Sequence, residues 1–189
     1  MENLTKQLAK CPVIAAVRNK EANRLAIDSP VAAIFLLNTS ILELPDMVQD
    51  AHAGGKRVFL HLDLAEGLGR DDAAVRWCVD HLHVDGLIST RPSLLKLASE
   101  LGVLTIQRLF LMDSSSFDHG KRLLKNTPPD MAEVLPGIAP KAIRQLCEAL
   151  DKPVIAGGLV TEPREIALAL QAGALAVSVG RPQLWHYTL

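Results

Sequence analysis

The stretch Pro153-Val-Ile-Ala-Gly-Gly-Leu159 leads through an amphipathic segment to Leu175-Ala-Val-Ser-Val-Gly-Arg181. Both runs are short and apolar, which is typical of parallel strands that are covered on both faces. Between them, Thr161 precedes Glu-Pro and suits the start of a helix, and Gly173 suits the left-handed residue that ends one. The stretch therefore predicts a strand, a helix and the next parallel strand.

Six more runs of this kind occur earlier in the chain. They are Pro12–Arg18, Val31–Asn38, Val58–Asp63, Gly86–Arg91, Val103–Leu111 and Met131–Gly137. The eight runs begin about every 23 residues, which leaves room in each interval for one strand, one turn and one three-turn helix. Other residues that suit helix boundaries are Ser114 at a start and, at ends, Gly54, Gly55 and Gly102.

Eight successive strand–helix units favour an α/β protein with one closed (β/α)8 barrel, a TIM-barrel-like fold over residues 1–189. With 189 residues the chain is near the short end for such barrels, so we expect one compact domain with short loops. The alternative is a doubly wound open sheet, which usually has five or six strands and a glycine-rich turn after the first. Because the first run ends Ala16-Val-Arg-Asn19 without glycine, the sequence favours the barrel.

The composition limits the kinds of partner. The chain has 20 Lys and Arg against 21 Asp and Glu, so no global positive field attracts it to nucleic acid or anionic lipid. Aromatic residues make up only 4%, which disfavours RNA binding by base stacking on aromatic platforms. Any contact with RNA must therefore come from a local basic patch.

The apolar segments and the cysteines indicate a cytoplasmic protein. The longest aliphatic and aromatic run is Val31–Leu37, whereas a membrane span needs about 20 residues. The segment Cys11–Val17 barely reaches the length of a signal-peptide core and is followed directly by arginine, so we interpret it as a strand. The cysteines are odd in number and widely spaced, which favours small core residues over disulfides or a zinc cluster: Cys11, Cys78 and Cys147.

Arginines stand at or near the ends of four predicted strands: Arg18, Arg91, Arg108 and Arg181. In a barrel, the carboxyl ends of the strands converge on the face where ligands bind. The guanidinium group offers a fixed fork of donors that suits phosphate and carboxylate. Each arginine could instead pair with a carboxylate at the rim, but four at equivalent positions favour a small anionic ligand.

The last two predicted strands carry a candidate phosphate site. Barrel phosphate sites are commonly built from the loops after strands seven and eight and a short extra helix. Gly157 and Gly158 end the seventh strand, and Gly180 and Arg181 end the eighth. The missing side chains let backbone N–H groups approach an anion, and Pro182 suits the first turn of a short helix. The glycines could also be simple turn formers.

Other polar residues are predicted inside the barrel. A two-residue period places His61 and Asp63 on one face of the third strand. Glu133 interrupts an apolar run and needs a buried partner, which Gln107 or Arg108, or Asn38, could supply. The cluster could serve acid–base or metal chemistry, or it could be a hydrogen-bonded network that orients a polyol.

We find no His-Glu-x-x-His, no Walker loop, no nucleophile elbow and no lysine at a strand end for a Schiff base. The sequence therefore offers no recognised catalytic motif and no metal-binding motif.

Six motifs, taken in order, carry a resemblance to a known family. They are Ala16-Val-Arg-Asn19, His61-Leu-Asp-Leu-Ala-Glu-Gly-Leu68, Asp85-Gly-Leu-Ile-Ser-Thr-Arg91, Gln107-Arg-Leu-Phe-Leu-Met-Asp-Ser114, Glu133-Val-Leu-Pro-Gly137 and Pro153-Val-Ile-Ala-Gly-Gly-Leu159. With them the chain resembles the glycerol-3-phosphate-responsive antiterminator family, also called glycerol uptake operon antiterminator regulatory proteins. The resemblance implies a TIM-barrel-like fold, glycerol 3-phosphate as effector, no cofactor and no catalytic role. It also implies action on the leader mRNA of glycerol-utilisation genes, where the protein permits read-through of a terminator.

Our expectations for partners follow from both lines of argument. The ligand site is expected to include, besides the arginines, glycines and polar residues named above, Gly137 of the fifth motif. RNA is expected to contact outer helices through Lys121, Arg122, Lys125, Lys141 and Arg144, although such charges usually solvate a helix face. The alternative function is a barrel enzyme acting on a phosphorylated three-carbon substrate, such as a phosphodiesterase, isomerase or aldolase. The residues leave open whether the protein forms a homo-oligomer.

Overall fold

The computed structural model describes residues 2–187 and contains a closed barrel of eight parallel strands in chain order. The barrel closes where the first and last strands pair, with Ala15 opposite Val179. This confirms the predicted (β/α)8 barrel. The strands are β1 Val13–Val17, β2 Ala33–Leu36, β3 Arg57–His61, β4 Gly86–Ser89, β5 Leu104–Phe110, β6 Met131–Leu135, β7 Val154–Gly157 and β8 Ala176–Val179.

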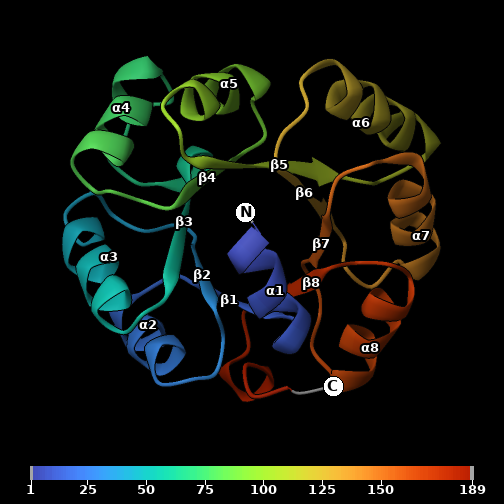
Figure 1. Ribbon diagram of the computed structural model, residues 1–189, viewed down its shortest axis with the longest axis horizontal. Coiled ribbons are helices and arrows are strands. Elements are labelled where there is room, and N and C mark those ends of the chain that lie inside the picture. Colours follow the sequence, from blue (N-terminus) through green and yellow to red (C-terminus); the bar gives the residue numbers. More distant parts are fainter. Residues whose placement is uncertain (1, 188–189) are drawn as a thin grey trace.

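Seven helices form a ring outside the barrel, and one further helix precedes it (Figure 1). The first helix, α1, spans Glu2–Lys10 and lies over the centre of the barrel in this view. Its Leu4 and Leu8 are buried and join the apolar cluster inside the barrel, so α1 closes one mouth. The ring consists of α2 Lys20–Ile27, α3 Leu44–Ala53, α4 Asp72–Asp80, α5 Pro92–Glu100, α6 Ser114–Asn126, α7 Pro140–Ala149 and α8 Pro163–Gln171.

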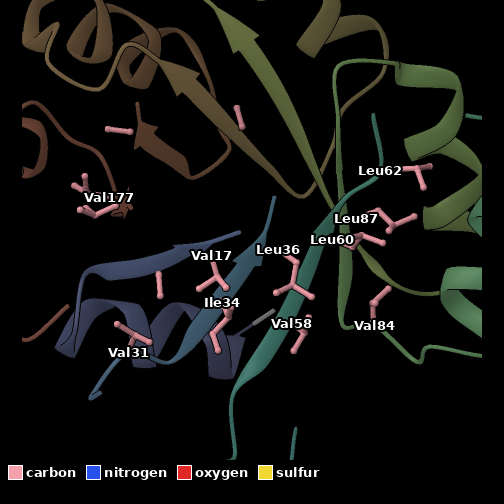
Figure 2. Packing of buried hydrophobic residues seen from close by; sticks show 14 of the residues in the cluster. Val17, Val31, Ile34, Leu36, Val58, Leu60, Leu62, Val84, Leu87 and Val177 are labelled. Carbon is pink, nitrogen blue, oxygen red and sulfur yellow. The ribbon is translucent and has the colours of Figure 1, made fainter. Parts of the chain in front are cut away.

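Alternation along each strand divides the core into two clusters. In β2, Ile34 and Leu36 belong to the cluster between the sheet and the helices, and Figure 2 shows them beside Val58 and Leu60 of β3. The intervening Phe35 points into the barrel, where its ring meets that of Phe59 edge-on at 5.6 Å. Because both faces of the sheet are buried, the strands appear in the sequence as unbroken apolar runs.

The predicted helix start at Ser114 is confirmed, because α6 begins at this residue, whereas α8 begins at Pro163, two residues after Thr161. Asp113, not Ser114, is the N-cap of α6, and its carboxylate accepts the N–H of Ser116 at 2.7 Å. At α8 the N-cap is Glu162 and not Thr161. Aspartate caps a helix as well as serine does, so adjacent Asp and Ser gave an ambiguous signal.

The helix-end glycines are confirmed with one exception. Gly55, Gly102 and Gly173 adopt positive φ angles of 73°, 85° and 105° after α3, α5 and α8. Gly54 has a φ of −78° and therefore does not need to be glycine for conformational reasons. The chain needs only one left-handed residue there, and Gly55 supplies it.

The cysteines are all free thiols. Cys78 on α4 is fully buried, and this burial raises its pKa to about 12. Cys11 and Cys147 are half-buried. The expected core position is therefore confirmed for Cys78, and Cys147 packs against the edge of the same cluster.

None of the helices within residues 2–187 is long and apolar enough to cross a membrane.

Candidate ligand-binding site

A cavity of about 300 Å³ opens at the carboxyl ends of strands β1, β5, β6, β7 and β8. This size suits a small ligand. Its walls are formed by Ala16, Arg18, Leu37, Arg108, Glu133, Leu135, Gly158, Leu159, Val160, Thr161, Ser178, Gly180 and Arg181. Three of the four predicted strand-end arginines are among them, so convergence on one face brings these residues together as the sequence predicts.

The charges around the cavity favour an anion. Three arginines and one glutamate line it, which gives a net charge of +2. Arg18 follows β1 and Arg181 follows β8, and these two strands are neighbours because they close the barrel. Both side chains are exposed, and neither forms an ion pair within residues 2–187. Their guanidinium groups are therefore available to an incoming phosphate or carboxylate.

A buried ion pair forms the floor of the cavity. The Arg108 Nε donates to Glu133 Oε2 at 2.7 Å, and the Ser178 hydroxyl donates to Glu133 Oε1 at 2.6 Å. Arg108 is only 6% exposed and Glu133 only 1%. The two residues are directly opposite each other in the β5–β6 register, so the strand pairing itself places them in contact.

Of the partners considered for Glu133, the structure selects Arg108. Gln107 directly precedes Arg108 on β5, so its side chain points to the opposite face of the sheet. There it donates to the backbone carbonyls of Ser89 and Arg108 and lies outside the cavity lining. Asn38 is exposed, with a φ of 54°, and within the described residues forms no hydrogen bond to Glu133.

Sequence reasoning missed Ser178. It lies one register position inside the end of β8, on the same face as Ala176, which points into the barrel. A period-two count along Ala-Val-Ser-Val could have identified it, because the inner cluster contains Ala176 and the alternation then turns the Ser178 side chain inward.

The four predicted glycines have different roles. Gly158 and Gly180 line the cavity, and Gly158 has a positive φ of 77°. Gly157 leaves space for the ion pair, because a Cβ there would come within 2.6 Å of the Glu133 Oε1. Gly137 lies outside the lining and donates its N–H to the Gly158 carbonyl at 3.0 Å, which supports the loop after β7.

His61 is buried beside the cavity floor. It is 2% exposed, and both of its ring nitrogens have no hydrogen-bond partner within the described residues. The Asp63 Oδ2 lies 3.9 Å from the His61 Nδ1, too far for a hydrogen bond. Burial and the positive charge of Arg108 lower the pKa of His61 to about 4, against the opposing effect of Asp63. The imidazole is therefore neutral at pH 7.

Asp63 does not lie on strand β3 as predicted. The strand ends at His61, and Asp63 belongs to a short 3-10 helix, Leu62–Leu64. Its carboxylate accepts the Thr90 N–H at 2.7 Å and the Ser89 hydroxyl at 3.0 Å. It thereby holds the end of β4. Arg91 is half-exposed, with its Nε 3.7 Å from Asp63, and lies outside the cavity lining.

The predicted short helix after β8 is a single 3-10 turn, Pro182–Leu184. It is held by Trp185, which is fully buried and donates its indole N–H to the Val179 carbonyl at 2.7 Å. This anchor positions the loop that carries Gly180 and Arg181.

The five basic residues expected to contact RNA lie on α6 and α7, outside the lining of the cavity. Within residues 2–187, no three His, Cys, Asp or Glu side chains come together in a geometry that could hold a metal ion.

The closed barrel and its arginine-lined cavity place the chain in the class of (β/α)8 barrels whose carboxyl face suits a small anion. The chain belongs to the glycerol-3-phosphate responsive antiterminator family, which it matches over residues 13–185. This confirms the resemblance found in the sequence motifs.

Similar proteins support the assignment of the chain to this family. The chain is 36% identical over 178 residues to the uncharacterized protein YgcP of Escherichia coli strain K12, covering 94% of this chain and 93% of YgcP. It resembles the glycerol uptake operon antiterminator regulatory protein of Listeria monocytogenes with a TM-score of 0.88 and 36% identity, over 92% of this chain and 94% of the other. It also resembles a glycerol uptake operon antiterminator-related protein of Thermotoga maritima, with a TM-score of 0.83 and 28% identity, over 94% of this chain and 99% of the other. Aldolases at 15% identity or less share the fold alone.

Proposed function

We propose that this protein is a cytoplasmic transcription antiterminator that binds glycerol 3-phosphate in the carboxyl-face cavity and, in that state, the leader mRNA of glycerol-utilisation genes. The main observation in favour of an anionic ligand is the cavity, which has three arginines and one buried carboxylate at the strand ends. Membership of a family described as glycerol-3-phosphate responsive supports the choice of this anion.

The cavity has two chemically different ends that match the two ends of the ligand. The exposed Arg18 and Arg181 and the backbone around Gly158 and Gly180 suit the phosphate. The buried Glu133, held by Arg108, suits the glycerol hydroxyls, because a carboxylate accepts hydrogen bonds from them. Neutral His61 lies outside the cavity lining but within reach of the Arg108 charge, and its ring nitrogens have no hydrogen-bond partner among the described residues.

We expect Arg181→Ala to weaken glycerol 3-phosphate binding roughly 10- to 100-fold, since one charge-assisted contact contributes about 1.5–3 kcal/mol. The matched control is Arg164→Ala, an exposed arginine on α8 that does not line the cavity, and it should leave affinity unchanged. Isothermal titration calorimetry measures both variants. Glycerol should bind far more weakly than its phosphate ester. Equal affinity for the two compounds would show that no anion site operates.

A regulator of this kind requires that glycerol 3-phosphate binding and RNA binding are thermodynamically linked. If glycerol 3-phosphate strengthens RNA binding, RNA must strengthen ligand binding by the same factor, and typical couplings are about 5- to 150-fold. Fluorescence anisotropy with a labelled leader RNA, with and without glycerol 3-phosphate, measures the first effect. Calorimetry with and without RNA measures the second.

The enzyme alternative makes a different prediction for the same cavity. An enzyme should convert glycerol phosphodiesters or triose phosphates when magnesium is added, and Glu133→Gln should abolish this turnover. If such turnover is found, and if glycerol 3-phosphate does not change RNA binding, the protein is an enzyme and not a regulator. We propose that no such turnover occurs, because Glu133 is held in an ion pair with Arg108 and, among the described residues, belongs to no group of three His, Cys, Asp or Glu side chains that could hold a magnesium ion.

A further inference from the structure

The outer helices divide the charge of the molecule between two sides. Helices α6 and α7 together carry five Lys and Arg against two acidic residues, a net charge of +3. Helices α3 and α4 carry four Asp against one Arg, a net charge of −3. Figure 1 shows the two pairs on opposite sides of the barrel. A chain with a net charge of only −1 therefore has one strongly basic wall.

The cations of this wall are free to bind a partner. On α6, Lys121, Arg122 and Lys125 stand at helical spacings of three and four residues, and Lys141 and Arg144 stand three apart on α7. Within residues 2–187, none of the five forms an ion pair with a carboxylate. Lys121 is half-buried, and its Nζ lies over the ring of Phe117, 5.6 Å from the ring centroid.

We propose that the α6–α7 wall binds the sugar–phosphate backbone of RNA. This inference rests on the proposed RNA binding and adds the surface that performs it. Unpaired Lys and Arg on exposed helix faces provide phosphate neutralisation, which supplies most of the sequence-independent affinity for nucleic acid. The low aromatic content is consistent with contacts to phosphates in place of base stacking.

The position of the wall connects it to the cavity. Strand β5 carries Arg108 and leads into α6, and β6 carries Glu133 and leads into α7. The buried ion pair at the cavity floor thus joins the two strands that carry the two basic helices. A ligand that acts on this pair has a short path to the RNA-binding wall.

A second copy of this chain is the competing occupant, since its acidic wall could face the basic one. The exposed large apolar side chains argue against it. Among the described residues they are Leu25, Leu42, Phe110, Met112, Ile138, Leu159 and Leu168. None lies within α6 or α7, and the three nearest, Phe110, Met112 and Ile138, precede these helices in the chain. Protein interfaces usually have an apolar and aromatic core, so helices whose exposed side chains are cations and not large apolar groups fit RNA better.

The test compares two variants that each lose two arginines and one lysine. The wall variant is Arg122→Gln, Lys125→Gln, Arg144→Gln. The control variant is Arg24→Gln, Arg76→Gln, Lys96→Gln, which removes from α2, α4 and α5 three exposed cations that form no ion pair within residues 2–187. The two variants have the same net charge. The probe is a leader RNA of a glycerol-utilisation operon from the source organism that includes the terminator hairpin, with a scrambled RNA of equal length beside it.

With glycerol 3-phosphate present, we expect the wall variant to lose about 100-fold in RNA affinity at 0.1 M salt. The slope of log K against log salt should fall by about 2, near 0.7 for each of three phosphates. The control variant should change less than threefold. Calorimetry and thermal melting confirm that both variants bind glycerol 3-phosphate and fold as the parent does.

The possible results distinguish a wrong RNA-binding surface from a wrong proposed function. If the parent binds leader RNA and the wall variant loses no more than the control, the wall is not the RNA surface, although the proposed function stands. If the parent binds no leader RNA with glycerol 3-phosphate, both proposals fail. If the three substitutions of the wall variant change the sedimentation coefficient of the protein but not its RNA affinity, the wall is an interface between copies of this chain. That outcome overturns the inference.

Discussion

Replacing Arg108 by methionine is expected to lower the free energy of unfolding by about 3–5 kcal/mol, because the buried Glu133 then loses its counterion. Glu133 is 1% exposed and, among the residues that the structure describes, keeps only the Ser178 hydroxyl as a hydrogen-bond partner in this variant. A single hydrogen bond does not compensate the cost of a buried carboxylate. Urea denaturation at pH 7 measures the loss.

Two controls identify the cause as an unpaired buried charge. The double variant Arg108→Met, Glu133→Leu removes both charges and should recover most of the lost stability, since apolar replacements of buried pairs are often neutral. Lys20→Met breaks an exposed pair, Lys20–Asp46, whose side chains are 44% and 67% exposed, and should lower the stability far less than Arg108→Met does. If Arg108→Met costs no more than Lys20→Met, water reaches Glu133 and the pair is not effectively buried.

The barrel could be predicted because both faces of its sheet are covered. Buried strands such as Ile34–Leu36 of β2 leave continuous apolar runs, and glycines such as Gly102 and Gly173 mark the helix ends. The helix starts were less certain, because Asp113 and Ser114 both suit an N-cap. Helix α1 was not among the predicted units, since it precedes the first strand and packs into the barrel mouth through Leu4 and Leu8.

The candidate site was predictable to the extent that strand alternation determines side-chain direction. Arg18, Arg181 and Arg108 come together because equivalent strand ends converge. Where the backbone leaves the strand, alternation fails. Asp63 turns into a 3-10 helix and binds the end of β4, and the choice between Gln107 and Arg108 depends on a register that the sequence does not reveal.

A second large effect is expected for stability at acid pH. The pKa of His61 is about 4 in the folded protein, lowered by burial and by Arg108, whereas an unfolded histidine has a pKa near 6.5. Between these values the unfolded chain binds more protons at His61 than the folded one, so stability falls as pH falls from 6.5 to 4. The loss attributable to His61 should total about 3 kcal/mol and stop growing below pH 4.

His61→Gln separates this contribution from the carboxylates that titrate in the same range, because glutamine does not ionise. Urea denaturation of parent and variant at several pH values gives the difference in unfolding free energy. That difference should shift by about 3 kcal/mol between pH 7 and pH 4, in favour of the variant at low pH, and should be constant above pH 7. A difference that does not change with pH would mean that His61 titrates normally. In that case water reaches the imidazole past Arg108 and Asp63. The two ring nitrogens, which have no partner among the described residues, would then form hydrogen bonds to water in the free protein.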